Sequence, residues 1–169
     1  MLSVLRHYDL PLSFPKNVLH EAHTIAKSRP DNQPSAEECA GRVDCRSHNV
    51  ITIDPEDAHD FDDAVSVWQD PETQHWQLHV HIADVGYFCP AGSALDREAY
   101  KRGNSVYFPD RVVPMLPEAL SNGWCSLRPN EDRGCLFVEM HVGADGRKRS
   151  HRLGRGLMRS AARWTYEAI

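Results

Sequence analysis

The 169-residue sequence contains no apolar run that approaches the roughly eighteen residues needed to span a membrane. Its N-terminal stretch, MLSVLRHYDLPLSF, also lacks the long apolar segment and the small-residue cleavage site of a secretory signal. We therefore expect a cytoplasmic protein with no membrane partner. With 41% hydrophobic residues and no internal repeat, the chain can form one domain with a sizeable core, and a monomer is the expected state.

Cysteines are few and show no paired pattern. There are five, an odd number, and none belongs to a C-x-x-C motif. This argues against the disulfide framework of a small secreted domain and against a zinc knuckle. We predict buried free thiols for the five cysteines, which are Cys39, Cys45, Cys89, Cys125 and Cys135.

Basic residues are missing from the most acidic stretch of the chain. Residues 51–67, ITIDPEDAHDFDDAVSV, contain no Lys or Arg but hold six carboxylates, which are Asp54, Glu56, Asp57, Asp60, Asp62 and Asp63. The flanking β-branched runs predict strands, so this stretch is not a solvated tail. Two unit charges about 4 Å apart repel by about 4 kcal/mol at an effective dielectric near 20. We therefore expect a cation to hold the carboxylates that converge.

The spacing of the aspartates favours a site that wraps around metal ions. Asp54 precedes a proline, which biases it to an extended backbone. Asp60 and Asp62 face one side of an extended segment, whereas Asp63 faces the other side unless the chain bends. Oxygen ligands alone favour hard ions, Mg²⁺ or Mn²⁺. A calcium EF-hand is excluded, because alanine and valine stand where its loop requires an acidic or amide residue and a glycine.

The net charge of −5 is unevenly distributed along the chain. Residues 127–163 hold nine Lys and Arg residues against four Asp and Glu residues. A polyanion could therefore meet a basic face that leads towards the acidic stretch. Arg128, Arg133 and the arginines of residues 147–159 are candidates for contacts with backbone phosphate.

Two helices are predicted with clear boundaries. Pro15 begins an amphipathic helix that Pro30 ends, followed by a polar loop over residues 29–38. Ser93 is the expected N-cap and Gly103 the stop of a second helix. The apolar stripe of the first helix consists of Val18, Leu19, Ala22, Ile25 and Ala26.

Strand patterns fill most of the remaining sequence. Residues 64–69 and 76–85 predict an antiparallel hairpin with one buried face, because apolar residues alternate with polar ones in the second run. CLFVEMHV and RKRSHRLGRGLM predict a second hairpin across a GADG turn. NSVYFP predicts a short strand, PMLPEALSNGWCSL an apolar helical turn, and SAARWTYEAI the start of another helix.

The acidic stretch is one of several motifs that occur together. TIDPEDAHDFDDAV resembles the signature of the RNB family, the RNase R and ribonuclease II type of 3′-to-5′ exoribonuclease. VHIADVGYF, SALDREAYKRGNSVYFPDRVVPMLPEALSNGWCSLRPNEDR and RSAARWTY follow in the family's order and at its spacing. The likeness runs from about Gly41 to the last residue, and HYDLPLSFPKNVLHEA is similar to the lead-in segment of RNase R.

This resemblance implies an α+β fold with a mixed, largely antiparallel sheet and packed helices. It implies that two Mg²⁺ ions, with Mn²⁺ as a substitute, are held by four residues that also organise the attacking water, namely Asp54, Asp60, Asp62 and Asp63. Glu56 and Asp57 have no implied metal role. Tyr107 is implied to stack against a base near the 3′ end of single-stranded RNA. The implied reaction is hydrolysis of RNA phosphodiesters to nucleoside 5′-monophosphates.

The resemblance also implies how the chain is organised. We expect residues 1–40 to be a lead-in segment with one amphipathic helix, and residues 41–169 to be the N-terminal half of an RNB catalytic domain. The family's OB-fold flanks and its S-P-I-R-R-Y segment, which supplies a transition-state arginine, are not found in the sequence. The complete parent protein is therefore expected to degrade RNA, and the isolated chain to be weak or inactive.

Two alternative functions are suggested by other residues of the sequence. His79 and His81 share one strand face with Asp84 nearby, which resembles the H-x-H element of zinc hydrolases. The residue spacing here differs from that of the metallo-β-lactamases, and the amidohydrolase barrel needs about 250 residues, more than this chain has. The favoured interpretation is therefore that the two histidines pack beside the sheet. The alternative function within the family is a non-catalytic RNA-binding or regulatory relative that uses the basic segment 128–163.

Overall fold

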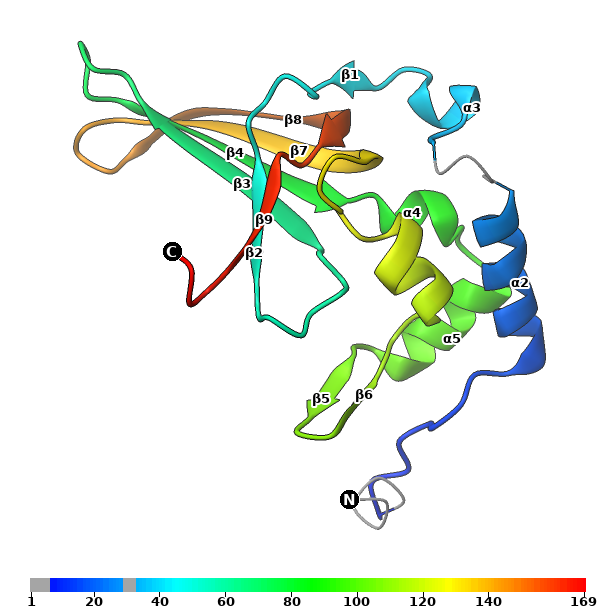
Figure 1. Cartoon of the computed structure of the whole chain (residues 1–169). Coiled ribbons are helices and arrows are strands. Elements are labelled where there is room, and N and C mark those ends of the chain that lie inside the picture. Colours follow the sequence, from blue (N-terminus) through cyan, green and yellow to red (C-terminus); the bar gives the residue numbers. More distant parts are fainter. Residues whose placement is uncertain (1–6, 29–32) are drawn as a thin grey trace.

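The computed structural model describes residues 7–28 and 33–169. Its centre is a seven-stranded mixed sheet (Figure 1). In spatial order the strands are β1 (Val43–Asp44), β8 (Lys148–Arg159), β7 (Asp132–Val142), β4 (Trp76–Ala83), β3 (Asp63–Gln69), β2 (Ile51–Asp54) and β9 (Ala162–Thr165). The five inner strands pair with one another in antiparallel fashion, whereas the edge strands β1 and β9 pair in parallel with β8 and β2. A separate antiparallel ribbon consists of β5 (Val106–Phe108) and β6 (Arg111–Val113).

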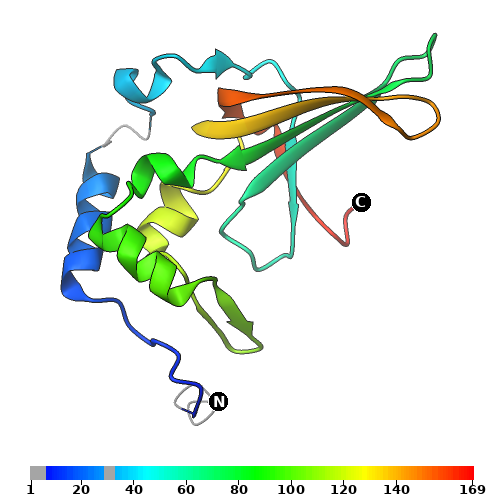
Figure 2. The same ribbon diagram turned by 180° about the vertical axis from the view of Figure 1, so that it is seen from behind.

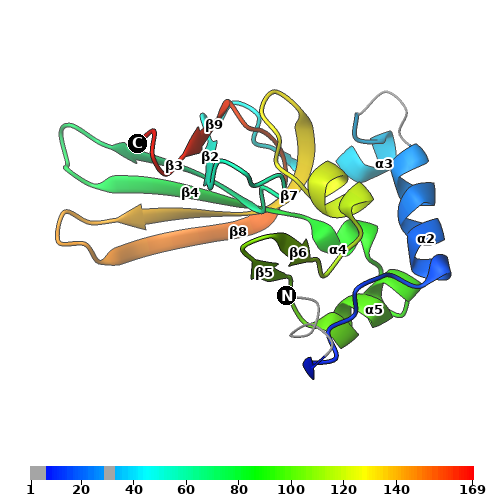
Figure 3. The ribbon, with the colours of Figure 1, turned by 60° about the horizontal axis from the view of Figure 1, so that its bottom comes forward.

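The helices gather at one end of the sheet. They are α2 (Lys16–Lys27), α3 (Ala36–Cys39), α4 (Val85–Phe88), α5 (Ala94–Arg102) and the one-turn π-type helix η1 (Leu120–Trp124). Figures 1 and 3 show α2, α4 and α5 together, while the β3–β4 and β7–β8 hairpins extend away from them. Helices segregated from a largely antiparallel sheet define an α+β fold, which confirms the predicted class. None of the helices in the described part of the chain is long and apolar enough to cross a membrane.

The two predicted helices are confirmed. α2 buries Val18 and Ala22 of its predicted apolar stripe. The predicted stop at Pro30 lies outside the described residues. Ser93 caps α5 by accepting a hydrogen bond from the backbone N–H of the third residue after it, and Gly103 follows the helix with a φ of 79°. A positive φ is favourable for glycine because it has no Cβ.

The two predicted hairpins are also present. β3 and β4 pair over their whole lengths, and β7 and β8 pair on either side of the GADG turn. Because each side chain alternates between the two faces of a strand, this register decides which residues meet on each face.

The C-terminal segment is a strand rather than the predicted helix. Ala162–Thr165 forms β9, which pairs in parallel with β2 so that Ile51 is opposite Ala162 and Asp54 is opposite Thr165. Main-chain hydrogen bonds to an open sheet edge outweigh the weak helical preference of a short segment. The pairing brings the last strand next to the start of the acidic stretch.

Both faces of β4 are partly covered, but near its C-terminal end the strand buries a histidine and exposes an isoleucine. The alternation over residues 76–82 predicts that the apolar side chains are buried. In the structure, His81 is 0% exposed and Ile82 is 43% exposed. Phe137 on the neighbouring β7 and His48 from the turn between β1 and β2 lie against the histidine face. The covering comes from segments distant in sequence, so the alternation alone could not show which face they cover.

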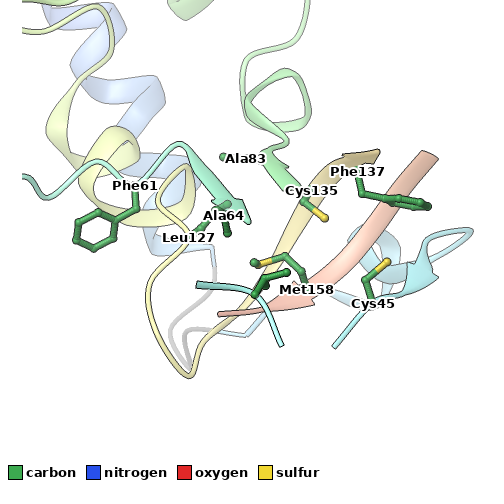
Figure 4. Packing of buried hydrophobic residues seen from close by; sticks show 9 residues of the cluster. Cys45, Phe61, Ala64, Ala83, Leu127, Cys135, Phe137 and Met158 are labelled. Atoms are coloured by element: carbon green, nitrogen blue, oxygen red, sulfur yellow. The ribbon is translucent and has the colours of Figure 1, made fainter. Parts of the chain in front are cut away.

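The core has two hydrophobic clusters. The first packs around the sheet and the loops that enter it (Figure 4), and it consists of Cys45, Val50, Phe61, Ala64, Ala83, Leu127, Cys135, Phe137 and Met158. The second joins the helices, and it consists of Val18, Ala22, Phe88, Leu95, Leu120, Trp124 and Cys125. α2 therefore shares a core with α5 and η1, while the predicted domain boundary near residue 40 remains a prediction.

All five cysteines are free thiols, as predicted. Cys45, Cys125 and Cys135 are buried, whereas Cys39 and Cys89 are only partly buried. Burial raises the pKa of Cys125 and of Cys135 to about 12, so both are neutral thiols at physiological pH.

A buried arginine connects the N-terminal segment to the β5–β6 ribbon. The side chain of Arg102 is 3% exposed and pairs with Glu98 at 2.9 Å. Its guanidinium also donates to the carbonyl oxygens of Pro11 and Pro114, at 3.1 and 3.0 Å. Since Pro114 directly follows β6, these bonds help to fix the position of the ribbon.

Gly154 of β8 provides a test of the packing on the histidine face. A Cβ at this position would lie 2.8 Å from Cε1 and Cζ of Phe137, which is only 3% exposed and has little room to move. We expect Gly154→Ala to lower the free energy of unfolding by about 1–3 kcal/mol, measured by urea denaturation. Gly86→Ala is the control, because its Cβ would have a single neighbour at 3.9 Å. Equal stability of the two variants would contradict this packing.

Candidate metal centre

The acidic stretch forms the loop between β2 and β3. Asp54 is the last residue of β2 and Asp63 is the first residue of β3, so the sheet fixes both ends of the loop. Fully buried Ser126 holds the middle. The backbone N–H of Phe61 donates to Ser126 Oγ at 3.0 Å, and Ser126 Oγ donates to the carbonyl oxygen of His59 at 2.9 Å.

The structure brings together all five residues that the sequence singled out. Asp54, Asp60, Asp62, Asp63 and Tyr107 line one cavity of about 300 Å³. Asp60 and Asp62 lie on the irregular part of the loop rather than on a strand. This bend allows side chains that alternate along an extended chain to face one cavity. The roles of these residues in metal and RNA binding are not tested by their proximity and stay predictions.

The charged forms of two aspartates are disfavoured in this cavity. Burial, followed by the charges of Asp60, Asp63 and Asp54, raises the pKa of Asp62 to about 6. Burial and the charge of Asp63 also raise the pKa of Asp54, and Asp54 Oδ2 is buried with no hydrogen-bond partner. A buried carboxylate oxygen without a donor, surrounded by like charge, fits a ligand of a cation. The donor set is entirely oxygen, which fits Mg²⁺ or Mn²⁺.

Tyr107 reaches the cavity from the β5–β6 ribbon, which Figures 1 and 2 show beside the β2–β3 loop. Its hydroxyl donates a hydrogen bond of 2.7 Å to Asp60 Oδ2, while 63% of the residue is exposed. Burial of the hydroxyl and the bond to Asp60 raise the pKa of Tyr107 to about 12. The tyrosine is therefore a stable donor at physiological pH, and its ring is accessible to a ligand.

Sequence reasoning missed the role of Arg163 in holding the loop. Its Nη2 donates to the carbonyl oxygens of Pro55 and Glu56, each at 2.6 Å, and its guanidinium lies 5.2 Å from the ring centroid of Phe61. The charge of Arg163 also partly offsets the raised pKa of Asp54. Nothing in the local sequence distinguishes it from the other arginines of the basic segment, because the contact depends on the pairing of β9 with β2.

The other two carboxylates of the stretch do not line this cavity. Glu56 and Asp57 are exposed, and Asp57 lines an adjoining cavity of about 260 Å³. Their lack of a metal role stays a prediction.

Several basic residues of segment 127–163 are already paired. Arg133 is 1% exposed, lies over the ring of Trp124 and pairs with Glu131, so the prediction that it contacts phosphate is wrong. Its burial in the core removes it from any surface. Arg152 is exposed but pairs with Glu139 at 2.7 Å. Phosphate contacts by the remaining exposed arginines stay a prediction.

The set of His79, His81 and Asp84 suggested by the H-x-H element is not assembled. Asp84 is instead engaged by Arg42 at 2.6 Å, and both side chains are 3% exposed. Arg155 Nε lies 3.8 Å from the same Asp84 oxygen, so two arginines already compensate the charge of this carboxylate.

The fold and the site define an α+β domain with a carboxylate cavity suited to hard divalent ions. Residues 42–169 match the family model described as RNB domain, and the chain belongs to this family. It is 48% identical over 166 residues to Ribonuclease R of Acidithiobacillus ferrooxidans, covering 98% of this chain and 36% of that protein. The chain thus spans about a third of the length of this relative.

Solved structures show the same fold. Mycoplasma genitalium RNase R in complex with ribose methylated single-stranded RNA matches with a TM-score of 0.77 at 32% identity, over 92% of this chain and 24% of that one. Yeast Ssd1, described as a pseudonuclease, matches with a TM-score of 0.70 at 24% identity, over 82% of this chain and 18% of that one. The likeness to Ssd1 concerns the fold alone.

The crowding of carboxylates predicts a stability effect for Asp62→Asn. A raised pKa means that the folded state binds more protons than the unfolded state between about pH 4 and pH 6, so stability falls as pH rises through this window. Asparagine does not ionise and escapes this loss. At pH 7.5 in chelator, we expect the variant to be more stable than the unmodified chain by about 1 kcal/mol, allowing for solvent screening at the exposed side chain.

Thermal unfolding at pH 4 and pH 7.5 measures this effect. The advantage of Asp62→Asn should shrink at pH 4, where the native aspartate is protonated. Asp57→Asn serves as the control for removing an exposed charge from the same loop. An advantage of the same size at both pH values would show that repulsion in the cavity is not its cause.

Proposed function

We propose that the protein containing this chain is a Mg²⁺-dependent 3′-to-5′ exoribonuclease that hydrolyses RNA to nucleoside 5′-monophosphates. The observation that carries the proposal is the convergence of Asp54, Asp60, Asp62 and Asp63 in one cavity. Membership of the RNB family and relatives named Ribonuclease R support the reaction class. Because the chain spans only part of these relatives, the activity is proposed for the whole protein.

The protein's task in this reaction is to position carboxylates. Asp54, Asp60, Asp62 and Asp63 would hold two Mg²⁺ ions, which would supply the charge that activates water and stabilises the leaving 3′ oxygen in an in-line displacement. Asp54 and Asp63 are fixed by the sheet, whereas Ser126 and Arg163 hold the loop between them. Such anchoring matters because a displacement of about 1 Å in a reacting group can lower the rate about 100-fold.

The substrate class follows from the cavity and its tyrosine. Tyr107 combines an exposed ring with a hydroxyl bound to Asp60, so a base stacked on the ring would lie next to the carboxylates. Stacking on aromatic side chains is a common way to bind single-stranded RNA. The Mycoplasma genitalium relative, solved in complex with ribose methylated single-stranded RNA, supports the same substrate class for this protein.

A chimera tests the proposed activity directly. This chain would replace the matching segment of the Acidithiobacillus ferrooxidans relative, with which it is 48% identical. We expect the chimera to shorten 5′-labelled RNA from the 3′ end when Mg²⁺ is present. Asp62→Asn should lower this rate about a thousandfold or more, because a carboxylate of the metal site is lost, while RNA affinity stays nearly unchanged.

Asp57→Asn is the matched control for the chimera, since it removes a charge from the same loop outside the four-aspartate cavity. It should retain near-native activity. The opposite outcome is a chimera that binds RNA without Mg²⁺-dependent cleavage, with Asp62→Asn changing only the RNA affinity. That outcome would contradict the exonuclease proposal and favour the non-catalytic RNA-binding alternative.

The isolated chain should be a poor nuclease. None of the residues that line the four-aspartate cavity is basic, and Arg163 is engaged by backbone carbonyl oxygens. The anionic phosphate in the transition state therefore has no protein cation beside it here. Such a cation typically lowers the activation barrier by several kcal/mol, which is about a thousandfold in rate. We expect the purified chain to trim labelled RNA at least about a thousandfold more slowly than the chimera. Equal rates would contradict this expectation.

A further inference from the structure

Three histidines meet on the sheet face opposite Asp63. In the hairpin register Asp63 pairs with Ile82 and Ala64 with His81, so Asp63 and His81 belong to opposite faces. His79 lies two residues before His81 on the same face, and His48 comes from the turn between β1 and β2. One ligand nitrogen from each histidine lies within 4.8 Å of the other two.

The outer nitrogen of each ring faces a separate partner. The three contacts are His81 Nδ1 with Cys135 Sγ at 3.4 Å, His48 Nε2 with Glu139 Oε1 at 3.9 Å, and His79 Nε2 with the Gln77 side-chain amide at 3.0 Å. On the inner side, His48 Nδ1 and His81 Nε2 are 3.4 Å apart, and His79 Nδ1 is buried with no hydrogen-bond partner. Metal-binding histidines are arranged in this way, with the outer nitrogen oriented by a second group.

The protonation state of the strand histidines suits a metal ligand. Burial and the neighbouring histidines lower the pKa of His81 to about 4 and lower that of His79 below its usual value. Burial thus disfavours the charged form of both rings. Without a ligand, the buried His79 Nδ1 remains unsatisfied, which is unfavourable for the folded state.

We propose that His48, His79 and His81 form a binding site for one Zn²⁺ ion. Three imidazole nitrogens suit zinc, whereas Mg²⁺ prefers oxygen ligands. Glu139 Oε1 lies 3.9 Å from the outer nitrogen of His48, on the side away from the three inner nitrogens, so a water molecule takes the fourth position. At 3.9 Å the Glu139 carboxylate is beyond hydrogen-bond distance, and a small movement of His48 would bring it into the outer position that carboxylates commonly take at zinc-bound histidines.

The geometry requires one local adjustment. Tetrahedral zinc with bonds of about 2.0–2.1 Å places its ligand nitrogens about 3.3 Å apart. The 3.4 Å separation of His48 Nδ1 and His81 Nε2 already fits this value. The ligand nitrogens of the three histidines lie at most 4.8 Å apart, so the widest pair has to approach by up to about 1.5 Å. His48 is half-buried on a turn between two exposed residues, so rotation of this side chain and a small shift of the turn provide the movement.

Zinc in this position would link the turn before β2 to the centre of the sheet. His48 precedes Ile51, the first residue of β2, and β2 ends at Asp54 in the acidic cavity. The ion would therefore stabilise the strand that carries one of the four aspartates, from the opposite face of the sheet. The site does not depend on the proposed nuclease activity, because it shares no ligand with the acidic cavity.

Zinc binding to the purified 169-residue chain tests the proposal, with calorimetry against a chelator for affinity and Co²⁺ absorption for ligand geometry. We expect one Zn²⁺ per chain, a rise in melting temperature on binding, and the intense visible bands of tetrahedral Co²⁺. His48→Gln and His79→Gln should each weaken zinc binding about 100-fold or more, since each removes one of three ligands. Circular dichroism of both variants verifies that they fold.

Two controls locate the bound ion. His75→Gln changes an exposed histidine in the β3–β4 turn and should leave affinity unchanged. The Asp54→Asn, Asp62→Asn double variant disables the acidic cavity and should also retain tight zinc binding. Native affinity in the folded His48→Gln variant, or loss of binding in the aspartate variant alone, would overturn the proposal. Either result would leave the nuclease proposal standing, since that depends on Mg²⁺ and RNA cleavage.

Discussion

Mutual repulsion among four carboxylates is the constraint on which the rest of the site depends. Like charges that line one cavity repel one another, so the loop would spread apart without restraint. The chain supplies that restraint without cancelling the charge. Two strands hold Asp54 and Asp63, while Ser126 and Arg163 bind backbone atoms of the intervening loop rather than its cavity carboxylates. The negative potential remains in the cavity for a cation to neutralise.

Side chains alternate between the two faces of a strand, so the β3–β4 hairpin places Asp63 and the two strand histidines on opposite faces. Asp63 lies on one face of β3, and the neighbouring position, Ala64, faces the side on which His81 is buried. Oxygen donors and nitrogen donors therefore lie on opposite sides of one sheet. Under the two proposals, this separation matches the preferences of hard and borderline divalent ions, so neither set of residues has to discriminate against the other's metal by affinity alone.

Local patterns predicted the elements that depend on local physics. Ser93 and Gly103 delimit α5 because capping and a positive φ are properties of a few residues, and the GADG turn likewise delimits its hairpin. The predictions failed where distant segments decide the outcome. β9 is a strand because it meets the edge of β2. His81 of β4 is buried because His48 covers it. Arg163 holds the acidic loop because β9 brings it there. The aspartates were recognisable in sequence because all four lie within one loop.

Under the proposed function, Tyr107 serves both the carboxylates and the substrate. A carboxylate oxygen has two lone pairs, so Asp60 Oδ2 can accept the hydrogen bond from Tyr107 and still bind a cation. The raised pKa keeps the tyrosine protonated, so this bond persists throughout the physiological pH range. Under the proposed function, the hydroxyl orients a metal ligand while the exposed ring receives a base. The distance between the bound nucleotide and the carboxylates is then set by the length of a single side chain.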